Sequence, residues 1–242
     1  MKTFNLLTIL LFSINLGIAQ EKLATVISSK SKIDLTESLS ITNQFLDSTF
    51  SNGRVSYTDG KVSTAPMNYN LLDNSIYFYD KSKNLLKLVG LERIKSIRYS
   101  NRFFYVENSE LYEIVSEIMN YTLLRKLKTK IVKNNEVKGP YGMSLDNSST
   151  ETYIGASKTA DGEIIYGNDL SNNRSKINID IKIYRYYYLL INGEYKKINR
   201  VKDIAKLFPQ KKDELVNFIN VNNLSLTNEK DLIKLVEFCV GK

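Results

Sequence analysis

The sequence predicts an α+β protein that is mainly β: an antiparallel meander, folded as a sandwich or an open barrel, with a small C-terminal helical subdomain. Three observations support this fold class. Short apolar runs separated by turn residues about every 8–12 positions extend from residue 50 to 199. Residues 176–191 alternate so that one face of the expected strand is apolar. From residue 200 onward the apolar period changes to about 3.6 residues, as in helices.

The first 19 residues have the pattern of a signal peptide. Lys2 precedes a short apolar run, and Gly17 and Ala19 are small residues two apart, which predicts a cut before Gln20. The run is shorter than the roughly 20 apolar residues needed to span a bilayer; the alternative is a buried N-terminal helix. The single cysteine, Cys239, excludes a lipoprotein signal. We therefore expect export by a signal peptide to the periplasm or the medium, with residues 20–49 as an N-terminal segment.

The 50–199 region is expected to be an antiparallel β domain. Asp59-Gly60 is typical of a type I′ hairpin turn, and Ser100-Asn101 marks another tight turn. Residues 111–119 fit either a helix face or a strand, and we favour a strand because a lone helix would interrupt the meander. The meander is followed by a Gly/Ser/Asn-rich excursion at 134–175, in which Asp161-Gly162 suggests a small hairpin.

A run of tyrosines lies in the strand predicted at 176–191. Tyr184, Tyr186 and Tyr188 share the less apolar face, about 6.8 Å apart along the strand, and Asn192-Gly193 then turns the chain. Such a ladder could hold a stacked ligand beside a basic patch. The alternative, which we favour, is that the tyrosines pair across strands or are covered by the C-terminal helices.

Residues 200–242 are expected to form three short helices, at about 200–208, 209–221 and 229–240. Pro209 suits the first turn of the second helix, and Asn228 suits the N-cap of the third. So short a segment does not reliably hold a core alone, so we expect it to pack on the sheet or on a partner.

The formal net charge is +8, and basic residues gather in two stretches. The 125–133 stretch contains no acid, and the 196–212 stretch contains only Asp203. A basic exported protein favours an anionic partner, although the charge could serve solubility alone. The candidate anionic-ligand residues are therefore Arg125, Lys126, Lys128, Lys130, Lys133, Tyr184, Tyr186 and Tyr188.

Several kinds of catalytic chemistry are excluded or disfavoured. The chain has no histidine, which removes Ser–His and Cys–His catalysis and histidine-ligated metals. Cys239 lies on the apolar side of a predicted helix, so we expect it to be buried. The acids of 92–117 are expected at solvated strand edges and turns: Glu92, Glu107, Glu110, Glu113 and Glu117. We predict no catalytic residue, cofactor or metal and favour a protein that is not an enzyme; a carboxylate-based hydrolase is the alternative.

Four stretches resemble a group of exported Bacteroidota proteins with no assigned activity. They are GRVSYTDGKVSTAPMNYNLLDNSIYFYD (53–80), SNRFFYV (100–106), VKGPYGMS (137–144) and FPQKKDELVNFINVNNLSLTNEKDLIKLVEF (208–238). The resemblance implies export, and because its motifs are silent on chemistry, no catalytic residues are carried over from it.

The functional hypothesis is a non-catalytic cell-envelope protein with a binding or structural role. Its partner would be an unidentified envelope component, either a protein or an anionic surface. The chain is not expected to be an integral membrane protein. The alternative is a binder of a lipid headgroup, lipopolysaccharide or an acidic glycan, with nucleic acid disfavoured.

Overall fold

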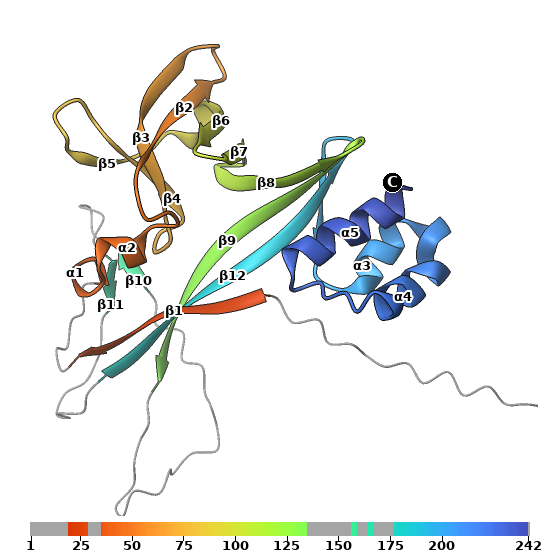
Figure 1. Ribbon diagram of the computed structural model, residues 1–242. Helices are drawn as coiled ribbons and strands as arrows, with labels where there is room; N and C mark the ends of the chain where they lie inside the picture. Colours follow the sequence, from red (N-terminus) through yellow and green to blue (C-terminus); the bar gives the residue numbers. More distant parts are fainter. Residues whose placement is uncertain (1–18, 29–34, 135–155, 159–163, 167–176, 242) are drawn as a thin grey trace, which may run out of the picture. The chain divides into compact units, whose positions relative to one another are not determined.

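The computed structural model describes residues 19–28, 35–134, 156–158, 164–166 and 177–241 (Figure 1). They belong to two compact units, Ile18–Lys197 and the C-terminal segment from Ile198 onward. The first unit is mainly β and the second is helical, which confirms the predicted fold class.

The first unit is built on one large antiparallel sheet. Its strands are β1 (Ala19–Ser28), β2 (Ser51–Tyr57), β3 (Val62–Asn70), β4 (Ser75–Tyr79), β5 (Leu85–Lys87), β6 (Ile94–Tyr99), β7 (Arg102–Glu107), β8 (Glu110–Ile118), β9 (Tyr121–Asn134), β12 (Ile177–Ile191) and β13 (Glu194–Ile198). Two short helices, α1 (Leu35–Ser38) and α2 (Ile41–Gln44), precede β2, and a 3-10 turn, η1 (Leu91–Arg93), precedes β6. The strand predicted at 111–119, where a helix face is the alternative, is confirmed as β8, and Met119 lies in the turn that follows with a φ of 54°.

The sheet is open, with the order β1-β12-β9-β8-β7-β6-β2-β3-β4-β5, and β13 also pairs with β12. Most neighbours in the sheet are neighbours in the chain, so the predicted meander is confirmed. There are two exceptions: β6 pairs with β2, and the long strand β12 pairs with β1 as well as with β9 and β13. The N-terminal segment is therefore part of the sheet: Gln20 of β1 pairs with Tyr184 of β12.

Glycine-containing turns close the predicted hairpins in two ways. Asn192 and Gly193 both have positive φ, 49° and 80°, as a type I′ turn requires. At Asp59-Gly60 only the glycine has a positive φ, 84°, so the hairpin forms but the type I′ prediction is wrong there. The Asp59 carboxylate instead accepts a hydrogen bond from the Lys61 backbone N–H at 3.0 Å.

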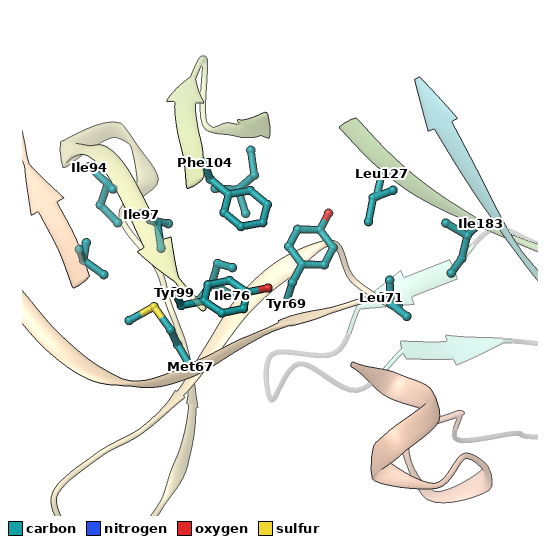
Figure 2. Close-up of a cluster of buried hydrophobic side chains, with 12 residues drawn as sticks. Met67, Tyr69, Leu71, Ile76, Ile94, Ile97, Tyr99, Phe104, Leu127 and Ile183 are labelled. Carbon is teal, nitrogen blue, oxygen red and sulfur yellow. The ribbon is translucent and has the colours of Figure 1, made fainter. Parts of the chain in front are cut away.

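One face of the sheet, called here the core face, carries the main hydrophobic cluster (Figure 2). Alternation along each strand places these side chains on the same side. At the centre, the Phe104 ring lies between two tyrosine rings, with 5.8 Å between its centroid and that of either Tyr69 or Tyr99. The buried residues of the cluster are Val55, Met67, Tyr69, Leu71, Ile76, Ile94, Ile97, Tyr99, Phe104, Leu111, Leu127 and Ile183.

Gly53 leaves room on the core face for the side chains of Met67 and Tyr99, which lie against its Cα. A Cβ added at Gly53 would lie 2.5 Å from Met67 Sδ and 2.7 Å from Tyr99 Cβ. We therefore expect Gly53→Ala to lower the free energy of unfolding by about 1–3 kcal/mol, because an extra methyl group overpacks the core. Chemical denaturation followed by circular dichroism measures this loss. Asn52→Ala, at the exposed neighbouring position, is the control; equal stability of the two variants would contradict the prediction.

A second cluster joins the N-terminal segment to β12. Val26 of β1 and Leu35 and Leu39 around α1 are buried with Leu72 and two isoleucines of β12, Ile179 and Ile181. The alternation predicted for 176–191 is visible here, since Ile179, Ile181, Ile183, Tyr187 and Leu189 are all buried.

The excursion at 134–175 is described only in part. Strands β10 (Ala156–Lys158) and β11 (Ile164–Tyr166) pair antiparallel as a separate two-stranded sheet. The turn predicted at Asp161-Gly162 lies outside the described residues, as does the rest of the excursion after β9.

The C-terminal unit contains α3 (Val201–Leu207), a 3-10 turn η2 (Pro209–Lys211), α4 (Lys212–Val221) and α5 (Glu229–Val240). The Asn228 side chain accepts a hydrogen bond from the Lys230 backbone N–H, so its predicted N-cap role is confirmed. The rings of Phe218 and Phe238 stack with centroids 4.0 Å apart. In the part of the chain that the structure describes, no helix combines the length and apolar character needed to cross a bilayer.

Candidate functional site

The pairing of β9 with β12 brings the predicted lysines and tyrosines together. Lys128 is the cross-strand partner of Tyr184, and Lys126 is the partner of Tyr186. All of these side chains lie on the face of the sheet opposite the core face, called here the outer face. We define the tyrosine–lysine patch as Lys126, Lys128, Lys130, Lys182, Tyr184, Tyr186, Tyr188 and Lys197, with Tyr112 and Tyr195 at one end.

Three lysines of the patch lie against tyrosine rings, and the longest of these contacts places Lys126 Nζ 5.4 Å from the centroid of the Tyr112 ring. Lys130 Nζ is 4.8 Å from the centroid of the Tyr184 ring, and Lys197 Nζ is 4.4 Å from that of Tyr186. All three distances are within the range of cation–π attraction. The half-buried rings therefore orient ammonium groups at the surface, and part of each ring face is already occupied.

The other tyrosines of the patch form a cluster at its end. The Tyr112 ring lies edge-on to Tyr188 at 5.3 Å, and its centroid is 4.9 Å from that of Tyr195. Burial raises the pKa of all three phenols. For Tyr112 the hydrogen bond that its hydroxyl donates to Glu110 Oε2, at 3.0 Å, raises the pKa further. These phenols are therefore neutral at ordinary pH and can donate hydrogen bonds.

Two carboxylates lie at the ends of the patch. Glu110 forms an ion pair with Lys126, and the hydrogen bond from that lysine lowers the pKa of the Glu110 carboxyl. Asp180 pairs with Lys22 at 2.8 Å and accepts a hydrogen bond from Thr25 at 2.7 Å. Between them, Lys128, Lys182 and Lys197 have no carboxylate partner among the described residues. The middle of the patch therefore carries an uncompensated positive charge.

Two of the candidate residues are not brought into the patch. Arg125 points to the core face, since it pairs in register with Tyr187 and Glu113 rather than with the even-numbered tyrosines. Lys133 pairs in register with Ile179, and its side chain lies outside the described residues.

Arg125 belongs instead to a partly buried ionic network on the core face. Its Nη2 atom lies 2.6 Å from Glu113 Oε2, and Arg102 Nη1 lies 2.6 Å from Glu113 Oε1. Arg102 also forms a two-bond pair with Asp47, at 3.0 Å and 2.9 Å. We define the ionic network as Asp47, Arg102, Glu113 and Arg125.

The expectation that Glu113 is solvated is wrong: its side chain is only 7% exposed. The physical reason is pairing, because two guanidinium groups from neighbouring strands satisfy both carboxylate oxygens. Asp47 and Glu113 share Arg102 between them, an arrangement that joins β7 and β8 to the segment before β2. We interpret it as structural.

The second basic stretch, 196–212, is partly compensated by nearby acids. Lys196 pairs with Glu194, and Arg200 and Lys211 pair with acids three residues later in α3 and α4. Exposed pairs of this kind contribute little to stability. The expectation that the C-terminal helices cover the tyrosines stays a prediction, because it concerns the arrangement of the two units.

Cys239 is buried as predicted, and burial raises the pKa of its thiol to about 11, so the thiol is protonated at neutral pH. Among the described residues there is no group of three or more His, Cys, Asp or Glu side chains placed to hold a metal ion.

Comparisons with known proteins give no relative: no protein-family model, no curated protein and no solved structure matches this chain. The resemblance to exported Bacteroidota proteins stays a prediction.

Proposed function

We propose that this protein is a non-catalytic, exported binding protein that holds an extended acidic polysaccharide on the tyrosine–lysine patch. The observation that carries this proposal is the pairing of β9 and β12, which places Lys126 and Lys128 beside Tyr186 and Tyr184 on one face. Lys128 and Lys130 project from alternate positions of β9, and Lys182 of β12 lies on the same face, so several ammonium groups together suit a chain of carboxylate or sulfate groups. Phenol hydroxyls beside them suit the hydroxyls of the sugar rings.

The geometry favours a glycan over single-stranded nucleic acid. Nucleic-acid platforms stack bases on open aromatic faces. Here Lys130 and Lys197 lie over the rings of Tyr184 and Tyr186. A ligand therefore meets ammonium groups and hydroxyls first, rather than bare rings.

A membrane surface fits less well than a glycan. Proteins that insert into the headgroup region do so with exposed apolar side chains beside basic ones. The large apolar side chains exposed among the described residues are Ile41, Val62, Leu85, Leu86, Val89, Met119, Val216 and Val221, and none belongs to the patch.

Export is part of the proposal, with the mature protein in the periplasm or the medium. A cut before Gln20 would remove only Ala19 from β1. The pairing of β1 with β12 would remain from Gln20 and Tyr184 onward. The sheet and the expected processing site are therefore compatible.

The proposal predicts salt-sensitive binding that depends on the patch. The test variant replaces Lys128, Lys130 and Lys197 by glutamine, and calorimetry measures binding to polygalacturonate at low and moderate salt. We expect at least about a tenfold loss of affinity at low salt and a flatter salt dependence, because fewer counterions are released. The same release of counterions accompanies binding to any linear polyanion, so the affinity for polygalacturonate should also fall as the salt concentration rises.

A charge-matched variant separates the patch from net charge. It replaces Lys81, Lys95 and Lys212, which are exposed and lie outside the patch, by glutamine. We expect it to bind like the unchanged protein. Equal losses in both variants, no binding to any acidic polysaccharide, or tighter binding to an oligonucleotide or to anionic vesicles would overturn the proposal.

A further inference from the structure

Two arginines lie directly opposite each other on the outer face of β2 and β6. Arg54 and Arg98 are cross-strand partners in the sheet register, and both are exposed. Residues in this relation have Cβ atoms about 4.5–5.5 Å apart, and like charges so placed repel. The pair therefore costs stability unless something compensates its charge.

No acid lies at the neighbouring positions of the sheet. On the strands to either side, Arg54 pairs in register with Thr64 of β3, and Arg98 pairs with Phe103 of β7. The diagonal neighbours on β2 and β6 are Asn52, Ser56, Ser96 and Ser100. Within the described chain, neither guanidinium forms an ion pair or a side-chain hydrogen bond. Their donors are available to a ligand.

The pair lines an open groove of about 550 Å³. Such a volume suits a small organic molecule rather than a bare ion. The groove also presents uncharged hydrogen-bonding groups, so an anion held there would meet donors on several sides. We define the arginine groove by the side chains of Asn52, Arg54, Thr64, Pro66, Arg98 and Ser100.

We propose that the arginine groove binds the tetrahedral oxyanion of a small phosphate or sulfate ester. Two guanidinium forks from adjacent strands can donate to the oxygens of such a group, and charge-assisted bonds of this kind are the strong ones. The hydroxyls of Thr64 and Ser100 and the Asn52 amide add neutral donors. The groove lies on β2, β3 and β6, whereas the patch lies mainly on β9 and β12, so this site does not depend on the proposed glycan site.

The test is a titration of the full chain with glucose 6-phosphate, glucose 6-sulfate and glucuronate at low salt, followed by calorimetry or chemical-shift changes. We expect both esters to bind and glucuronate to bind at least several-fold more weakly. Free phosphate and sulfate, titrated alongside, show how much of the affinity the sugar adds. No ester binding, or equal binding of glucuronate, would overturn the assignment.

Single variants locate the site and separate binding from folding. Arg54→Gln and Arg98→Gln are each expected to weaken ester binding about tenfold or more, since each removes one charge-assisted contact. Arg93→Gln, outside the groove and paired with Glu92, is the control and should leave binding unchanged. Binding that is unaffected by Arg54→Gln and Arg98→Gln would refute the groove.

Two further measurements distinguish a ligand-binding role of the arginines from a structural one, and the arginine groove from the tyrosine–lysine patch. Removing either arginine should leave the thermal midpoint equal or higher, because repulsion is relieved; a clear drop would indicate a structural role instead. The patch variant with Lys128, Lys130 and Lys197 replaced should bind the ester normally. That result separates a failure of the groove from a failure of the glycan site.

Discussion

Replacing Glu113 by alanine is expected to lower the free energy of unfolding by about 3–5 kcal/mol. The carboxylate joins Arg102 and Arg125 at 2.6 Å each, and its side chain is 7% exposed. Its removal leaves both guanidiniums partly buried, at 23% and 15% exposure, with their charge less compensated. The cost comes mainly from these uncompensated charges rather than from the lost attraction.

Urea unfolding followed by far-ultraviolet circular dichroism measures this effect. Glu117→Ala is the matched control, since Glu117 is an exposed residue of the same strand, and its change should stay within about 0.5 kcal/mol. A second variant, Arg102→Met, should also be strongly destabilising, because Arg102 links Glu113 to Asp47. If Glu113→Ala proved as stable as the control, the ionic network would not hold the strands together.

The second large effect is expected for Phe104→Ala, at about 3–5 kcal/mol. The Phe104 ring is 2% exposed and lies nearly parallel to the rings of Tyr69 and Tyr99, at interplanar angles of 8° and 9° (Figure 2). Its removal loses the transfer free energy of the ring and leaves a cavity that the surrounding strands cannot fully close.

The next residue along β7 provides the control. Phe103 is half-buried on the outer face, where its ring meets Tyr105 edge-on at 5.3 Å. Phe103→Ala should therefore cost about 1–2 kcal/mol. Equal losses at the two positions would contradict the assignment of the core face. Denaturant midpoints and slopes, measured for both variants, decide between the outcomes.

Much of the fold follows from local sequence patterns. The alternation through 176–191 predicts both the length of β12 and which of its faces is buried. Asn192-Gly193 predicts the turn that follows, and the change of period at residue 200 predicts the helices. Each of these features depends on residues close together in the chain, where alternation and turn chemistry act directly.

The candidate site was only partly predictable, because it depends on strand pairing. The same alternation rule, applied to β9, separates the odd-numbered Arg125 from Lys126, Lys128 and Lys130, and it indicates which residues share a face. It does not indicate that Tyr186 lies opposite Lys126, which the register fixes. Likewise, Glu113 looks like a solvated acid until its partners on β7 and β9 are known. The Arg54–Arg98 pair was missed for the same reason.

The pairing of β1 with β12 has a consequence for how the chain folds. Thr25 and Asp180, which share a hydrogen bond in this pairing, are 155 residues apart. During synthesis β1 emerges first but has no partner until nearly the whole of the first unit has followed. Contacts this distant in sequence raise the contact order and slow folding. Although β1 is synthesised before β12, it is therefore among the last strands to pair in the sheet. The cluster of Val26 with Ile179 and Ile181 forms only when β1 and β12 have paired.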